Sequence, residues 1–110
     1  MSESYRLETL LKLRTRAREA AEQELAVKRQ AEAKAKHQLE IAIQLRKDHE
    51  DLLRRGREEL YDGADVTIGL LQQRDAVLKA RTIELEALVR KEEDAQKTLK
   101  LAETASAKAL

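Results

Sequence analysis

The stretch Tyr61-Asp62-Gly63-Ala64-Asp65 interrupts two long runs of helix-forming residues near the middle of a 110-residue chain. The glycines of the chain, Gly56, Gly63 and Gly69, all lie within or beside this stretch. Glycine tolerates the positive backbone angles that a chain reversal needs. The Asp62-Gly63 pair of this stretch is typical of a helix stop followed by a turn. Asp65 is a candidate N-cap for the next helix. The stretch therefore predicts the tip of a hairpin.

The composition favours two long helices over a compact interior. Charged residues make up 39% of the chain and aromatic residues only 2%, and proline and cysteine are absent. Such a mixture, rich in Ala, Glu, Lys, Leu and Arg, is typical of coiled coils, whereas compact cores depend heavily on aromatic side chains. We predict an all-α fold, an antiparallel coiled-coil hairpin that forms a single domain over residues 1–110. Its first helix covers residues 4–61, its turn residues 62–65 and its second helix residues 66–108.

Leucines recur at multiples of seven residues in both halves, and a strict seven-residue repeat indicates a left-handed supercoil with a partner helix. They are Leu11, Leu25, Leu39, Leu53 and Leu60 in the first half, and Leu71, Leu78, Leu85 and Leu99 in the second. A row one residue ahead of the first set, with Leu10, Leu45 and Leu52, makes the apolar face wider than a two-stranded seam needs. Polar residues at core-like positions, such as Arg46 and Glu92, can fix the register.

The two predicted helices differ in length, which leaves part of the first one without a partner. A reversal centred near Ala64 places Leu53 opposite the region of Asp75 and the carboxyl end of the chain opposite Arg18. The residues before Arg18 then form an overhang that contains Leu7, Leu10, Leu11 and Leu13 together with Lys12, Arg14, Arg16 and Arg18. This set is either a solvated face or a docking surface, since each leucine that becomes buried contributes about 1.5–3 kcal/mol.

Enzyme, metal and nucleic-acid functions find little support in the sequence. No glycine-rich phosphate loop or Cys/His cluster is present, and His37 and His49, twelve residues apart on one helix, cannot share a metal ion. The net charge of +1 and interleaved charges argue against a nucleic-acid partner. No apolar run approaches the roughly 20 residues of a membrane span. We expect a non-enzymatic cytoplasmic protein without cofactors, metal or direct membrane insertion.

The opening of the chain resembles a known family. It reads Tyr5-Arg6-Leu7-Glu8-Thr9-Leu10-Leu11-Lys12-Leu13-Arg14, followed by Glu19-Ala20-Ala21-Glu22-Gln23-Glu24-Leu25-Ala26, and the second helix opens with Leu70-Leu71-Gln72-Gln73. With a single hairpin tip in mid-chain, this pattern resembles the FliJ/YscO family over nearly the whole chain. These proteins are central stalks of flagellar and virulence-associated type III secretion systems.

The resemblance implies a two-stranded antiparallel coiled coil whose open end inserts into the hole of the hexameric export ATPase and promotes its assembly or activity. The coil would also contact the cytoplasmic part of the export gate, and export chaperones are further candidate partners. Such a protein is cytoplasmic and peripheral to the inner membrane through the export apparatus. A structural or adaptor coiled coil without an ATPase partner is the alternative.

Two sets of binding residues follow from the resemblance. The ATPase-binding set is Leu7, Leu10, Leu11, Arg14, Arg18, Leu99 and Leu101. The gate-binding set is Gln38, Ala42, Leu45 and His49 on the first helix, with Arg74, Leu78, Arg81 and Leu85 on the second.

Overall fold

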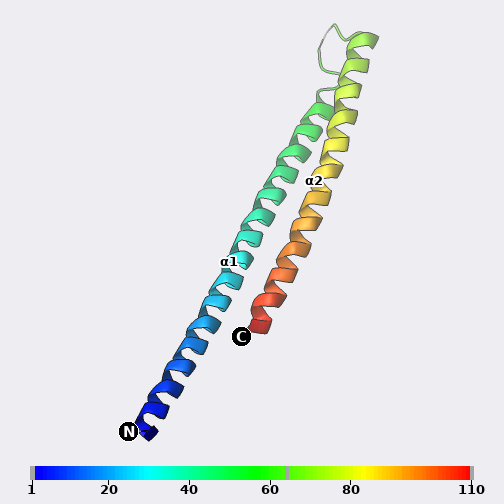
Figure 1. Cartoon of the computed structure of the whole chain (residues 1–110). Coiled ribbons are helices and arrows are strands. Elements are labelled where there is room, and N and C mark those ends of the chain that lie inside the picture. Colours follow the sequence, from blue (N-terminus) through cyan, green and yellow to red (C-terminus); the bar gives the residue numbers. More distant parts are fainter. Residues whose placement is uncertain (1, 64, 110) are drawn as a thin grey trace.

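The fold is an antiparallel pair of long helices. The computed structural model describes residues 2–63 and 65–109, in which α1 spans Ser2–Glu58 and α2 spans Ile68–Ala109. The two helices lie side by side along a rod of 98 × 17 × 16 Å, with the connection at one end and the last turn of α2 part of the way along α1 (Figure 1). The predicted all-α coiled-coil hairpin is confirmed.

A narrow seam with the spacing of a heptad repeat joins the helices. Its positions alternate three and four residues apart on both helices, which keeps one stripe of each helix against the other. Only two apolar side chains of the described residues, Ala35 and Leu53, are fully buried, as expected for a core only two helices thick. The seam positions are Leu25, Lys28, Glu32, Ala35, Leu39, Ala42, Arg46, His49, Leu53 and Gly56 on α1, Leu60 in the connection, and Leu71, Arg74, Leu78, Arg81, Leu85, Leu88, Glu92, Ala95, Leu99, Ala102 and Ser106 on α2.

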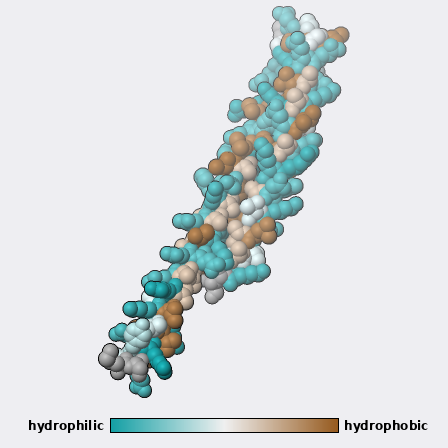
Figure 2. Space-filling model, viewed as in Figure 1, coloured by the Kyte–Doolittle hydropathy of each residue, from teal (hydrophilic) through white to brown (hydrophobic). Residues whose placement is uncertain are grey.

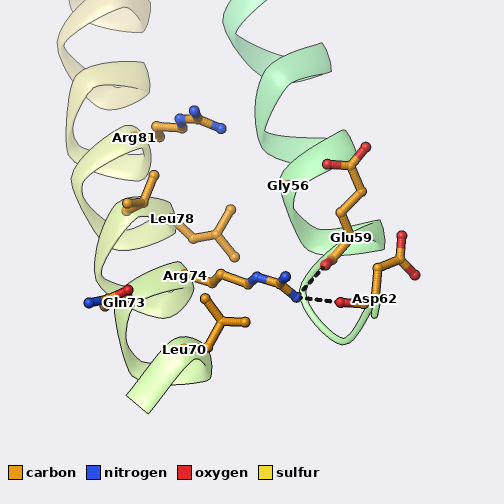
Figure 3. Close-up of a pocket in the computed structure, with 9 residues that line it drawn as sticks. Gly56, Glu59, Asp62, Leu70, Gln73, Arg74, Leu78 and Arg81 are labelled. Carbon is orange, nitrogen blue, oxygen red and sulfur yellow. Dashed lines mark hydrogen bonds between the residues drawn. The ribbon is translucent and has the colours of Figure 1, made fainter. Parts of the chain in front are cut away.

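The helix α1 ends three residues earlier than predicted because an arginine of α2 binds the carbonyls of the connection. The Nη1 atom of Arg74 donates to the carbonyl oxygens of Glu59, Leu60 and Asp62 at 3.1, 2.9 and 2.8 Å, and Figure 3 shows the side chain reaching the connection. The Glu59 carbonyl also accepts a hydrogen bond from the backbone N–H of Asp62 at 3.1 Å. The Leu60 and Asp62 carbonyls lie past the last helical residue, where helical partners are lacking. Gly63 has the positive φ of 111° expected for the reversal; Ala64, which the sequence placed at its centre, lies outside the described residues.

The N-cap of α2 is Thr67, so the predicted cap at Asp65 is wrong. The Thr67 hydroxyl accepts a hydrogen bond from the backbone N–H of Leu70 at 3.1 Å, and α2 begins at the next residue, Ile68. Threonine is among the residues that satisfy the free N–H groups of a first helical turn. Because Thr67 holds this place, Asp65 remains in the connection and the second helix begins two residues later than predicted.

Thr67→Ala should lower the free energy of unfolding by about 1 kcal/mol, the usual cost of losing a cap. Chemical denaturation followed by circular dichroism measures this difference. Thr98→Ala is the matched control, because Thr98 is an exposed residue within α2 whose hydroxyl donates to the Asp94 carbonyl of the same helix at 3.0 Å. Equal losses in the two variants would contradict the cap assignment.

The register of the hairpin differs from the predicted one. Arg46 pairs with Glu92, and Leu53 lines a surface depression together with Leu85, ten residues beyond the predicted partner Asp75. The reason is the connection: its residues run alongside the first turns of α2, which extend past the end of α1 (Figure 1). The helix α2 is therefore displaced towards the tip.

This displacement lengthens the unpaired part of α1. Every residue from Glu3 to Glu24 is exposed, and Leu25 is the first half-buried residue of α1. The sequence had placed this boundary near Arg18. We call residues 2–24 the overhang.

Candidate functional site

The candidate sites of this hairpin lie on its exposed surface. The part of the chain that the structure describes holds no group of three His, Cys, Asp or Glu side chains arranged to bind a metal ion. It also contains no helix that combines the length and apolar character of a membrane span. Exposed apolar and charged side chains form the candidate sites described below.

The overhang exposes four leucines. Leu7 and Leu11 are each 66% exposed, and Leu10 and Leu13 are also exposed. Figure 2 shows apolar side chains among hydrophilic ones at this end of the rod. An apolar stripe on a solvated helix is typical of a binding surface, so the overhang is the first candidate site.

A band of positive charge accompanies the leucines. Lys12, Arg14, Arg16 and Arg18 follow one another with no acidic residue between them. The Nε atom of Arg18 lies 3.4 Å from the Glu22 carboxylate on the same helix, where both side chains are exposed. Exposed pairs of this kind contribute little to stability. The cations therefore remain available to a negatively charged partner.

The ATPase-binding residues suggested by the resemblance fall into two separate groups. Leu7, Leu10, Leu11, Arg14 and Arg18 are exposed on the overhang, whereas Leu99 is half-buried in the seam and Leu101 is exposed on α2. With Arg46 level with Glu92, Leu101 lies beside residue 37 of α1, about 40 Å from Leu11 at 1.5 Å per residue. The structure brings the first five together and leaves the last two apart.

Six of the eight suggested gate-binding residues are half-buried in the seam, and only Gln38 and Leu45 are exposed. The six are Ala42, His49, Arg74, Leu78, Arg81 and Leu85. His49 illustrates their role: its Nε2 atom lies 2.7 Å from the carbonyl oxygen of Arg81 and 3.7 Å from the Glu84 carboxylate. These residues hold the hairpin together, so substitution of any of them would affect folding as well as binding.

A charged cluster crosses the seam at Arg46. Its Nη1 atom donates to Glu50 at 2.9 Å, and its Nε atom donates to Glu92 of α2. The hydrogen bonds to Glu50 and Glu92 raise the pKa of Arg46 above its ordinary value, so this arginine stays charged. The cluster pairs one position of α1 with one position of α2, and the predicted register role of Arg46 and Glu92 is consistent with this contact.

A depression of about 450 Å³ lies near the tip, and no pattern in the sequence predicted it. Its walls come from the end of α1, the connection and the first turns of α2, as Figure 3 shows. Gly56 leaves the space open, because a Cβ atom there would lie 2.7 Å from Cδ2 of Leu78. A glycine at a heptad position was the available signal for a close approach of the helices, because glycine carries no Cβ atom.

Gly56→Ala should raise the free energy of unfolding by up to about 1 kcal/mol, because alanine is the better helix former. The methyl group requires Leu78 to move, and the adjoining depression, which both residues line, gives its side chain room. Gly56→Ile should instead lower stability by about 1–3 kcal/mol through overpacking. Thermal unfolding of both variants measures the two changes in stability. Higher stability in both variants would show that the helices do not approach closely at Gly56.

The two antiparallel helices and their heptad seam define the class of the protein, a coiled-coil hairpin with an unequal open end. No family model, curated protein or solved structure matches the chain.

Proposed function

We propose that the chain is a non-enzymatic stalk of a type III protein export apparatus. Its open end enters the central hole of the hexameric export ATPase and promotes assembly or turnover of the ring. The observation that carries the proposal is the overhang, a continuous helical segment with exposed leucines and arginines at one end of a rod. The opening sequence that resembles the FliJ/YscO family lies in this same segment.

The shape supports a mechanical role. A rod without six-fold symmetry presents a different face to each of six ring subunits, and the open end of this rod is the single helix of the overhang. Such a rod can favour one subunit conformation over its neighbours, provided that it binds those conformations with different affinities. It need not supply any catalytic group.

The apolar overhang supports docking in a closed site. Each leucine that passes from water into a protein surface contributes about 1.5–3 kcal/mol, and four leucines are exposed within two turns of α1. Part of this gain offsets the lost freedom of the two partners. The overhang can make these contacts without any contribution from α2.

A contact with the cytoplasmic part of the export gate belongs to the same proposal and would keep the protein peripheral to the inner membrane. Of the residues suggested for it, Gln38 and Leu45 are exposed on α1. Their substitution tests this contact without disturbing the seam, whereas substitution of the other six would also disturb folding.

Binding to the export ATPase of the same export system tests the proposal. We expect the chain to co-sediment with the ATPase hexamer and the variant Leu11→Asp/Arg14→Glu to remain unbound. The matched control is Ile83→Asp/Arg90→Glu, which makes the same chemical changes on the exposed face of α2, where Ile83 is 67% exposed. If neither the parent chain nor the control binds the ATPase, the protein is better described as an adaptor coiled coil.

A further inference from the structure

We propose that the overhang is covered by an α-helix of the partner protein that packs in line with α2 and places carboxylates beside Arg14 and Arg18. The identity of the partner rests on the proposed function. The chemistry of the docking helix rests only on the overhang. The overhang thus specifies the chemistry of the partner's surface, whereas the fit of a rod in a hole specifies only its shape.

The first step is the phase of the seam. The seam of α1 begins at Leu25, and the same alternation of three and four residues continues without a break into the overhang. The continued positions are Ala21, Arg18, Arg14, Leu11 and Leu7. A heptad phase that is kept in register specifies a second helix packed in a left-handed coil. The surface that fits this stripe is therefore a helix in the position that a longer α2 would occupy.

The second step is the charge within this stripe. Arg14 and Arg18 occupy two successive seam positions, with leucines on one side and Ala21 on the other. Both would be largely desolvated under a partner helix, and a desolvated arginine requires a hydrogen-bonded counter-ion. Carboxylates bind guanidinium groups with two parallel hydrogen bonds. The partner helix should therefore be apolar opposite Leu7 and Leu11 and acidic opposite the two arginines.

The same hairpin already contains one pairing of this kind. Arg46 occupies a seam position of α1 and pairs across the seam with Glu92 of α2. Their side chains are only 24% and 14% exposed. An arginine of the α1 seam is thus satisfied by a glutamate of the opposite helix where the two helices are in contact. The overhang lacks that opposite helix among the described residues.

An anionic membrane fits this surface less well. A helix that lies on a membrane carries its cations on the polar face, away from the apolar stripe. Arg14 instead lies within the stripe, one turn from both Leu10 and Leu11. Burial of this face among lipid chains would bury the guanidinium group as well, which is costly.

A second copy of the chain also fits less well. The antiparallel pairing that brings Leu7 beside Leu25 of the second copy places Arg14 beside Arg18 of the second copy. A parallel pairing places Arg14 beside its own equivalent. Both arrangements bring like charges together in a seam, which is destabilising, so an acidic helix is the favoured occupant.

Two synthetic helical peptides, about three heptads long, test the proposal on the full chain. Both are apolar opposite Leu7, Leu11 and Ala21; one carries glutamate opposite Arg14 and Arg18, and the other carries lysine there. Fluorescence anisotropy of the labelled peptides at about 0.15 M salt measures their affinities. The acidic peptide should bind at least about tenfold more tightly, as expected for two desolvated charge pairs.

Two variants locate the effect on the helix. Arg14→Glu/Arg18→Glu should abolish the preference for the acidic peptide. Arg16→Glu should keep it, because Arg16 does not occupy a seam position, although it belongs to the same band of positive charge. Equal affinities of the parent chain for the two peptides would overturn the proposal. An equal loss of the preference for the acidic peptide in Arg14→Glu/Arg18→Glu and in Arg16→Glu would also overturn it.

The remaining outcomes distinguish other occupants and the proposed function. Sedimentation of the chain alone as a dimer that Leu11→Asp dissociates would overturn the proposal in favour of a second copy. Binding to phosphatidylserine vesicles that survives addition of the acidic peptide would overturn it in favour of a membrane. The peptide result does not depend on the export ATPase, so failure of the ATPase to bind the chain would refute the proposed function alone.

Discussion

Leu53→Asp is expected to unfold most of the hairpin. Leu53 is 3% exposed, the lowest value among the apolar side chains of the described residues, and it lies in the tip half of the seam beside Leu85. Loss of a buried leucine side chain costs about 2–5 kcal/mol, and the new carboxylate would be buried without a partner. A seam with two fully buried apolar residues has little stability to spare. We expect loss of the cooperative thermal transition, with residual helical signal in circular dichroism.

The neighbouring residue provides the control for this prediction. Leu52 has the same side chain but is 45% exposed, so Leu52→Asp should change the free energy of unfolding by less than about 1 kcal/mol, as surface substitutions usually do. A heptad seam turns one of these two leucines inwards and the other outwards. Similar unfolding midpoints for the two variants would show that the seam runs elsewhere.

Glu92→Lys is expected to have the second largest effect. The substitution removes the acceptor of the Arg46 Nε hydrogen bond and places a second cation beside that guanidinium group in the half-buried seam. Repulsion between like charges is stronger where water is partly excluded. The midpoint of thermal unfolding should fall by more than in Thr67→Ala and by less than in Leu53→Asp.

Glu93→Lys is the matched control, because Glu93 is the next residue, carries the same group and is exposed. Its effect should be small. Added salt should recover only part of the loss in Glu92→Lys, since half-buried charges are screened less than exposed ones. An equal loss in both variants, or full recovery with salt, would mean that the pair of Arg46 and Glu92 contributes nothing to the register.

The fold could be predicted from the sequence because its signals are local and repeated. Leucines at multiples of seven residues specify a coil, and Gly63 with Asp62 specifies a reversal between two stretches without proline. Each signal depends only on neighbouring residues, so none requires knowledge of the partner helix. The positive φ of Gly63 and the heptad seam both follow the prediction.

The register could not be predicted in the same way because it depends on contacts across the hairpin. The sequence placed the helix stop at Asp62-Gly63, but Arg74 binds carbonyls from Glu59 onwards and α1 already ends at Glu58. That contact joins residues on opposite sides of the tip. Its consequence, a connection that runs alongside α2, changes the partner of every seam residue.

The candidate site shows the same division. The exposed leucines of the overhang were predictable, because a longer helix must leave part of its apolar stripe uncovered. The boundary at Leu25 was not, since it follows from the register. The heptad spacing places His49 in the seam four residues before Leu53, but its contact with the Arg81 carbonyl depends on the register.

The ATPase rate of the export ATPase, measured with and without this chain, tests the proposed stalk function most directly. The account predicts stimulation by the parent chain and by Ile83→Asp/Arg90→Glu, and loss of stimulation in Leu11→Asp/Arg14→Glu. Circular dichroism should show both double variants folded, because all four positions are exposed. Equal stimulation by the parent chain and the overhang variant, or no stimulation by either, would contradict a stalk that acts through the overhang.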